Sequence, residues 1–477
     1  MHTIEKIGGT SMRDYASVRD NIILKNGLKN IYQRVFVVSA YGGITDNLLE
    51  HKKSGQPGVY ALYASATDDE SWFSKLESLS QELREINASL FGEGELLEKA
   101  NLFIDERLED AQKCLFDLQS LCQHGHFSLE THLITVREML ASIGEAHSAW
   151  NTTQLLRRDG VNAEFVDLTG WRAKRHITLD EQIRQAFESI DLKKQLPIVT
   201  GYAHCDAGLM SLFERGYSEM TFSRLAVLTE ATEAIIHKEF HLSSADPRIV
   251  GELNAVPIGR TNYDVADQLA NLGMEAIHPK AAKGLRQNNI PLRIKNTFEP
   301  EHTGTLITGD YVSDSPCVEI IAGCKGIFAL ELFDQNMSGN IYDYDRDVLA
   351  IIKRFKGHIV SKDTNANTLT HYLSANLKTV KRIRAAMEER FPEAEINQQK
   401  VAIVSAIGSD LQVPGILAKT VHAVSSRNIS VLAVHQSMRQ VDMQFIVSES
   451  NYDETIRSLH EALVEVHNHG RAICLAS

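Results

Sequence analysis

The sequence predicts an α/β protein in which a large domain with a mostly parallel sheet is followed by two smaller strand-and-helix modules. Three observations lead to this prediction. Short β-branched runs alternate with helical patterns over roughly the first 300 residues. From Val401 the order of elements is strand, helix, strand, strand, helix, and a looser copy of that order runs from Cys317 to about Phe391.

The strand-like runs of the large domain are short and are separated by helical patterns, which is typical of a parallel sheet with helical crossovers. Ligands bind beyond the carboxyl ends of such strands. We therefore expect the loops after Ile7, Ser39 and Gly201 to carry the functional site. The predicted strands are Thr3–Ile7, Val35–Ser39, Ala163–Leu168, Leu196–Gly201, Ala234–Phe240 and Pro291–Lys295.

A charged stretch from about Asp68 to Gln123 has few strand signals and a helical period. We expect a helical insertion at about 68–123 that packs on the core, with a lid over the site as the alternative. The apolar residues at spacings of three and four are Phe73, Leu76, Leu79 and Leu83, then Leu108, Ala111, Leu115 and Leu118.

The C-terminal modules follow a plan close to the ferredoxin-like one. Two such modules suggest a duplicated ligand-sensing region, and a purely dimerising surface is the alternative. We expect strands at Cys324–Leu332, Thr368–Ser374, Val401–Gly408, Ile429–Gln436 and Asp442–Ser448, and helices at Asp345–Phe355, Lys378–Phe391, Pro414–Ser426 and Tyr452–Val466.

The composition is that of an ordinary globular protein, because 43% of the 477 residues are hydrophobic and 23% are charged. The net charge of −13 argues against a nucleic-acid partner. No stretch approaches the length of a membrane span, and the N-terminus lacks a signal-peptide hydrophobic region. The six cysteines form no CxxC pair, which argues against a disulfide framework or a zinc site. We expect a cytoplasmic protein.

Two turns combine glycines with hydroxyl side chains after a strand. The first, Lys6–Ser11, has the sequence KIGGTS, in which backbone N–H groups can converge on an anion. It is not a P-loop, because the lysine precedes the glycines. The second passes from Ser39 through Gly42-Gly43 into a helix near Thr45, and helix N-termini attract anions. One such turn alone is more often only a tight turn.

Three further segments carry charged residues of interest. Glu145 follows a glycine on a predicted helix, where a lone glutamate is usually solvated. Arg215, Ser218 and Glu219 surround Gly216 just before another helix, and arginine suits bidentate recognition of a carboxylate or phosphate. Arg248 follows an Asp-Pro turn, from which it can reach a phosphate.

The order and spacing of these segments over nearly the whole chain resemble the aspartate kinases of the amino-acid kinase superfamily. The resemblance implies an amino-acid kinase fold, an αβα sandwich with a largely parallel sheet, followed by two ferredoxin-like βαββαβ ACT modules. The implied domains are 1–308, 316–392 and 399–477. The matching motifs are KxGGTS, SAxxGxT, Gly-Glu on a helix, Arg-Gly-x-Ser, Ala-Asp-Pro-Arg, His-Pro and Asn-Thr-Phe-x-Pro.

The resemblance also implies a reaction, in which ATP with Mg²⁺ phosphorylates the side-chain carboxylate of L-aspartate to 4-phospho-L-aspartate. Such a kinase makes the first intermediate of lysine, threonine and methionine synthesis, or of ectoine synthesis. No residue is assigned as a metal ligand. The implied ATP residues are Lys6, Gly8, Gly9, Thr10, Ser11 and Arg248, the aspartate residues are Ser39, Thr45, Glu145, Arg215 and Ser218, and the catalytic residues are Lys6 and Glu219.

This sequence departs from the family pattern in three places. Tyr217 and Glu219 replace the usual glycine and aspartate, and the stretch 237–243 replaces a loop that lines the nucleotide site. A nucleotide-binding lysine is missing at Glu275, where Lys280 is a candidate substitute. The departures resemble the divergent aspartate kinases associated with ectoine synthesis.

Two alternatives remain at this stage. One is a catalytically weak amino-acid sensor whose ACT modules carry the function. The other is a related kinase that acts on glutamate, acetylglutamate or a nucleoside monophosphate. The ACT modules imply an allosteric effector, lysine or threonine, and a homodimer or higher homo-oligomer.

Overall fold

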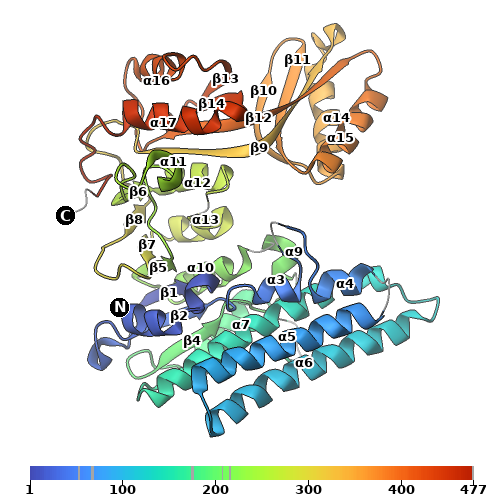
Figure 1. Ribbon diagram of the computed structural model, residues 1–477, viewed down its shortest axis with the longest axis vertical. Helices are drawn as coiled ribbons and strands as arrows, with labels where there is room; N and C mark the ends of the chain where they lie inside the picture. Colours follow the sequence, from blue (N-terminus) through green and yellow to red (C-terminus); the bar gives the residue numbers. More distant parts are fainter. Residues whose placement is uncertain are drawn as a thin grey trace. The chain divides into compact units, whose positions relative to one another are not determined.

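The chain divides into two compact units (Figure 1). The first comprises Met1–His241 and Ile277–Gly309, and the second comprises Leu242–Ala276 and Asp310–Ser477. The predicted domain limits stay predictions. The computed structural model describes residues 1–51, 54–65, 69–172, 177–206, 208–213, 216–274 and 276–474.

One sheet organises the first unit, with its strands in the order β3-β4-β2-β1-β5-β7-β8. Neighbouring strands run parallel except for the β7–β8 pair, as predicted for a largely parallel sheet. β8 was not predicted, because it is short and its alternate residues are only partly buried. The strands are β1 Thr3–Ile7, β2 Arg34–Val38, β3 Ala163–Val166, β4 Leu196–Thr200, β5 Glu233–Lys238, β7 Leu292–Asn296 and β8 Thr305–Thr308.

Helices cover both faces of this sheet, which explains why the central strands are buried almost throughout. α7 (Leu133–Arg158) and α10 (Tyr217–Leu228) lie on the face that carries Lys6. η1 (Val18–Ile23) lies over the opposite face. The remaining helices are α1 Gly9–Met12, α2 Tyr15–Ser17, η2 Leu28–Asn30, α3 Ile44–Leu48, α4 Val59–Ser65, η3 Leu129–Thr131, α8 Leu179–Phe187, α9 Leu209–Phe213 and α13 Pro279–Gln287.

The predicted helical insertion consists of two long helices, α5 (Asp69–Phe91) and α6 (Glu95–Cys122), that lie alongside α7 (Figure 1). Asp68 itself lies outside the described residues. The buried stripe of α5 begins at Trp72, which is fully buried, and not at the predicted Phe73. The insertion is therefore packed on the core, and α5 also contacts α3, where Asn47 donates to Glu82 at 2.7 Å and accepts from Lys75 at 2.8 Å.

The second unit contains a six-stranded antiparallel sheet in the order β10-β11-β9-β12-β14-β13. The strands β9 (Ile320–Phe333) and β12 (Glu395–Ile407) are long, and each serves both modules. The early half of β9 pairs with the late half of β12 in the second module, and the converse pairing completes the first. The two ferredoxin-like modules therefore share one sheet.

β10 was missed by the sequence analysis, because it is a partly exposed edge strand with alternating polar residues. The helices α14 and α15 pack on the first module, and α16 and α17 on the second. The other elements of this unit are β10 His358–Thr364, β11 Thr368–Ser374, β13 Val431–Gln436, β14 Asp442–Ser448, β6 Arg260–Asn262, α11 Pro247–Val250, α12 Tyr263–Asn271, η5 Gln335–Met337, α14 Ile341–Arg354, α15 Leu377–Arg390, α16 Ile416–Ser425, η6 Glu449–Asn451 and α17 Tyr452–Leu463.

None of the helices in the described part of the chain combines the length and the apolar character that a bilayer-spanning segment requires.

Candidate active site

The two glycine turns lie against each other at the carboxyl ends of β1 and β2. A Cβ at Gly9 would lie 2.6 Å from the carbonyl oxygen of Ala40, so only glycine allows this approach. The N–H of Gly8 donates to the carbonyl of His237 at 3.4 Å, which fixes the start of the loop to β5. α1 then follows, and the amide groups of Gly9, Thr10 and Ser11 precede its first helical hydrogen bond, from the Met12 N–H to the Gly8 carbonyl at 3.0 Å. The two predicted anion-binding turns thus form one continuous surface.

The second turn is held from both sides. Gly43 adopts a φ of +93° at the N-cap of α3, which carries Thr45. The Ser148 hydroxyl donates to the carbonyl of Ser39 at 2.8 Å. Arg13 Nε donates to the carbonyl of Gly42 at 2.8 Å, so Arg13 links the first turn to the second. The sequence analysis missed Arg13, because nothing in the spacing of a surface arginine indicates a contact 29 residues away.

Lys6 points from β1 toward α10, where its Nζ lies 3.7 Å from Oε1 of Glu219. Both side chains are largely buried. The second carboxylate oxygen of Glu219 accepts a hydrogen bond from the backbone N–H of His278, just before α13. The two predicted catalytic residues therefore lie close together. Glu219 pairs with Lys6 and also holds the start of α13.

Glu145 is buried, with only 2% of its surface exposed, so the expectation of a solvated glutamate is wrong. It accepts hydrogen bonds from the Tyr217 side chain and from the backbone of Tyr202 and Ala40, yet its Oε2 has no hydrogen-bond partner among the described residues. Burial raises the pKa of Glu145 to about 8, against the opposing effect of the Lys6 charge and these hydrogen bonds. A buried carboxyl with a missing partner is suited to bind a cation.

Gly201, at the end of β4, brings Glu145 and Ser218 together. A Cβ at Gly201 would lie 2.8 Å from the Ser218 Cβ and 2.9 Å from Glu145 Oε2. The third predicted loop thus joins the same site. The sequence predicted that this loop belongs to the site, but it did not predict why a glycine is needed there.

Arg215 lies outside the described residues. The segment before it is positioned by Glu138, which accepts hydrogen bonds from the Tyr202 hydroxyl at 2.7 Å and from the Ser211 backbone N–H at 3.0 Å. The latter bond caps α9. Glu138 and Tyr202 were missed, although a glutamate seven residues before Glu145 on one helix is a readable signal, because both lie on the same face.

The remaining predicted phosphate residues differ in their surroundings. The Ser11 hydroxyl is buried and contacts Glu239 at 3.4 Å and Thr297 at 3.1 Å, whereas Thr10 is exposed. Arg248 belongs to the second unit, where its exposed guanidinium pairs with Asp246 at 2.7 Å.

The departures from the family pattern can be located in part. Glu239, from the divergent stretch 237–243, holds Ser11. Glu275 lies outside the described residues. Lys280 donates to the carbonyl of Leu212 at 3.2 Å and lies over the Phe213 ring at 4.9 Å, so it supports α9.

Metal ligands are sparse at this site. Within the described ranges, no group of three or more histidine, cysteine or carboxylate side chains is arranged to hold a metal ion. A divalent cation here would depend on the phosphates of a nucleotide for most of its ligands.

Comparisons with known proteins agree with this arrangement. Residues 1–296 match the model of the amino acid kinase family, and residues 404–463 match an ACT domain. The aspartate kinase Ask_Ect of Stutzerimonas stutzeri is 54% identical over 478 residues, which is the whole length of both chains. The chloroplastic aspartokinase 1 of Arabidopsis thaliana is 23% identical over 90% of this chain and 75% of its own.

Two solved structures share the fold. Aspartokinase III of E. coli, in complex with lysine and aspartate, matches with a TM-score of 0.73 and 20% identity over 97% of this chain and 99% of its own. The aspartate kinase of Clostridium acetobutylicum matches with a TM-score of 0.70 and 20% identity over 96% and 99%. From its family match and its full-length relative, the chain belongs to the amino acid kinase family and, within it, to the aspartate kinases.

Proposed function

We propose that this protein is an aspartate kinase that transfers the γ-phosphoryl group of ATP to the side-chain carboxylate of L-aspartate, giving 4-phospho-L-aspartate and ADP. The observation that carries the proposal is the buried group of Lys6, Glu145 and Glu219 beside two glycine turns. The full-length relative named an aspartate kinase supports it.

On the phosphate side, Lys6 and the loop from Gly8 to Ser11 would hold the ATP phosphates. The loop supplies backbone N–H groups and the exposed Thr10 hydroxyl, and Lys6 supplies a positive charge that Glu219 keeps in place. The Ser11 hydroxyl is engaged with Glu239 and Thr297, so its contribution would come from its backbone. Arg248 stays a prediction from the sequence, and its guanidinium pairs with Asp246 within its own unit.

On the aspartate side, Glu145 would bind the α-ammonium group. The ammonium would supply the partner that Oε2 lacks and would draw the carboxyl into its charged form. Arg215, with Ser218, would bind the α-carboxylate, and Ser39 and Thr45 would line the pocket. Hydrogen bonds to charged groups contribute about 1.5–3 kcal/mol each, enough to select an α-amino acid over a simple diacid.

The chemistry needs no general base. The side-chain carboxylate of aspartate has a pKa of about 3.9 and is ionised at neutral pH. One of its oxygens forms the new bond to the γ-phosphorus, while the bond to the bridging oxygen breaks and ADP leaves. Catalysis then consists of aligning the two anions and neutralising their charge, which is the role we assign to Lys6.

Mg²⁺ would enter with ATP and would neutralise phosphate charge when bound. Few protein carboxylates are needed for this, because magnesium bound to nucleotides keeps water and phosphate ligands. Glu219, which pairs with Lys6 at 3.7 Å, is the carboxylate that we expect to lie close to the bound Mg²⁺.

An assay of ADP release with L-aspartate tests the proposed function. We expect turnover that depends on aspartate and is lost in Lys6→Ala. Turnover with glutamate, acetylglutamate or a nucleoside monophosphate, but not with aspartate, would contradict the proposed substrate. Turnover no higher than that of the Lys6→Ala variant would contradict the proposed kinase activity.

The proposal extends to regulation and assembly. The ACT modules would bind an amino-acid effector, and the same assay with lysine or threonine tests this. The homodimer stays a prediction, which a sedimentation experiment tests. The departures from the family's sequence pattern favour a role in ectoine synthesis.

A further inference from the structure

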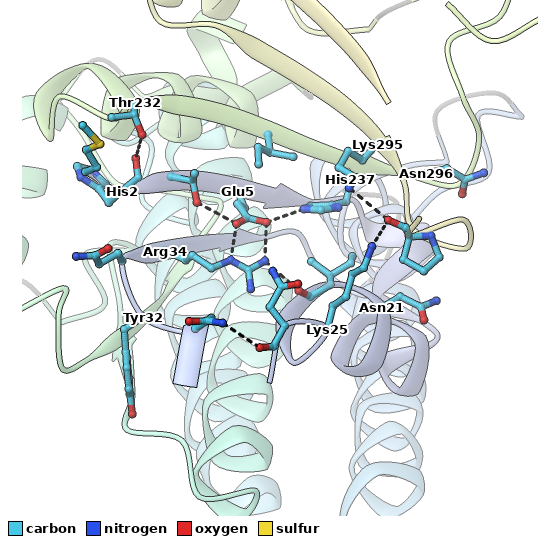
Figure 2. Close-up of a pocket in the computed structure, with 18 residues that line it drawn as sticks. His2, Glu5, Asn21, Lys25, Tyr32, Arg34, Thr232, His237, Lys295 and Asn296 are labelled. Carbon is cyan, nitrogen blue, oxygen red and sulfur yellow. Dashed lines mark hydrogen bonds and ion pairs between the residues drawn. The ribbon is translucent and has the colours of Figure 1, made fainter. Parts of the chain in front are cut away.

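A pocket of about 400 Å³ opens in the first unit, with Glu5, Arg34 and Lys295 among its lining residues (Figure 2). Glu5 lines this pocket, and consecutive residues of a strand point to opposite faces, so the pocket is separate from the Lys6 site. Its walls come from β1, β2, β5, the end of β7 and the segment around η1.

The floor of the pocket is a closed network around Glu5. Arg34 donates to both carboxylate oxygens, from Nε at 2.6 Å and from Nη2 at 2.9 Å, and His237 Nε2 lies 2.8 Å from Oε2. Although burial favours the neutral acid, Arg34 and His237 hold the pKa of Glu5 well below its usual range. Burial lowers the pKa of His237, so this ring is neutral at neutral pH. The charges of Glu5 and Arg34 therefore cancel.

The lining of the pocket also contains two lysines, Lys25 and Lys295, and no carboxylate of the lining pairs with either of them. Lys25 and Lys295 both donate to the one carbonyl of Pro300, the latter from 3.4 Å, as Figure 2 shows. Lys25 also pairs with the exposed Glu301 at 3.2 Å. Lys295 makes no ion pair with any carboxylate in the described part of the chain. Burial, together with the charge of Lys25, lowers the pKa of Lys295.

Two ammonium groups that converge on one neutral oxygen repel each other at a half-buried position. The charged side chains that line the pocket are Lys25, Arg34 and Lys295 on the positive side and Glu5 on the negative side. Positive side chains therefore outnumber negative ones in the lining, although the protein has a net charge of −13 and Glu301, outside the lining, pairs with Lys25. An anion with two or more acceptor oxygens would bridge the lysines and remove the repulsion.

We propose that this pocket is a binding site for a small oxyanion, a phosphate or a dicarboxylate, which Lys25 and Lys295 hold. The proposal does not depend on the kinase activity, because none of these residues belongs to the Lys6 site.

Isothermal titration calorimetry with inorganic phosphate and, separately, with succinate tests the site. The titrations use the full chain with Lys6→Ala, which removes the anion site of the glycine loop. We expect one equivalent to bind, and Lys25→Gln with Lys295→Gln to weaken binding by about tenfold or more, because two charge-assisted hydrogen bonds are lost. The matched control, Lys193→Gln with Lys194→Gln, removes the same charge from an exposed turn and is expected to bind normally.

The preferred anion identifies the source, because a phosphate site favours phosphate over succinate and a carboxylate site does the reverse. A second measurement uses the natural protein and needs no folded variant. Acetylation of Lys295, followed by mass spectrometry, is expected to slow when the anion is present, whereas acetylation of Lys194 is expected not to change. Binding that disappears with Lys6→Ala, or equal acetylation of Lys295 with and without both anions, would overturn the proposal.

Discussion

Glu5 and Lys6 are adjacent in β1, yet they belong to polar clusters of opposite character on the two faces of the sheet. On one face, Glu5 is saturated by Arg34 and His237 at 2.6–2.9 Å. On the other, Lys6 lies 3.7 Å from Glu219, and Glu145 keeps an oxygen without a partner. The pKa of Glu5 is held low, while that of Glu145 is raised to about 8.

The difference separates a structural cluster from a binding cluster. Buried polar groups in folded proteins are mostly paired, and Glu145 differs from the other exceptions in this chain because it is a carboxyl beside Lys6. A perturbed carboxyl in such a place marks a functional site more often than a structural one. Substitutions in the two clusters should therefore act on different properties, stability for the Glu5 cluster and turnover for the Lys6 cluster.

The largest effect is expected for Arg34→Leu on stability. This change removes both hydrogen bonds to Glu5 and those to the carbonyls of Ile22 and Ile23. A buried charge left without its partner costs about 3–5 kcal/mol. Urea unfolding should report this loss in the free energy of unfolding.

The control for this variant is Arg84→Leu, because Arg84 makes an equally short pair with Asp105 at the surface. Exposed pairs contribute about 0–1 kcal/mol, so the control is expected to lose little. Equal losses in the two variants would contradict the structural role of the Glu5 cluster.

Lys6→Ala is expected to act on turnover instead. Removing a group that neutralises charge in the transition state lowers kcat by about a hundred- to a thousandfold. The free energy of unfolding should change far less than in Arg34→Leu, because the Lys6–Glu219 pair is long and Glu219 keeps its bond to His278. The ADP-release assay with Lys194→Ala as control measures this, and unimpaired turnover would remove Lys6 from the mechanism.

Glu145→Gln should sharpen the comparison, because glutamine keeps the shape but cannot become the carboxylate that the ammonium group of aspartate would pair with. We expect kcat/KM for aspartate to fall by about ten- to a hundredfold, through KM, while KM for ATP is unchanged. Glu164→Gln, at a half-exposed position of β3, is the matched control. A rise in KM for ATP alone would contradict an ammonium-binding role for Glu145.

The sequence was sufficient for the features that depend on local patterns. β1 was predicted with its observed bounds, because a short β-branched run ends in a glycine turn, and the α5–α6 pair follows from its helical period. Features that depend on contacts between distant segments were not accessible. The burial of Glu145 is decided by α10 and β4, and the contact of Arg13 with Gly42 is decided by the way the two turns pack. Sequence could name site residues by resemblance, whereas only packing distinguishes a satisfied carboxylate from an unsatisfied one.

The pH dependence of stability gives the most specific test of the two clusters. The folded protein keeps a proton on Glu145 up to about pH 8, whereas the unfolded chain releases it near the ordinary glutamate pKa of 4.5. Stability should therefore fall as pH rises between these values, by about 1 kcal/mol per pH unit. Glu5 acts in the opposite direction, since its lowered pKa stabilises the fold above the ordinary glutamate pKa and the stabilisation is lost on acidification.

Urea unfolding of the natural protein and of Glu145→Gln, compared between about pH 6 and about pH 8, isolates this contribution. The variant lacks the titrating group, so its stability relative to the natural protein should increase with pH over that interval. A difference that stays constant would mean that Glu145 is already charged in the free protein. In that case a cation would already stabilise the Glu145 carboxylate before aspartate binds. Lys6 would be that cation, because its charge acts on this carboxyl.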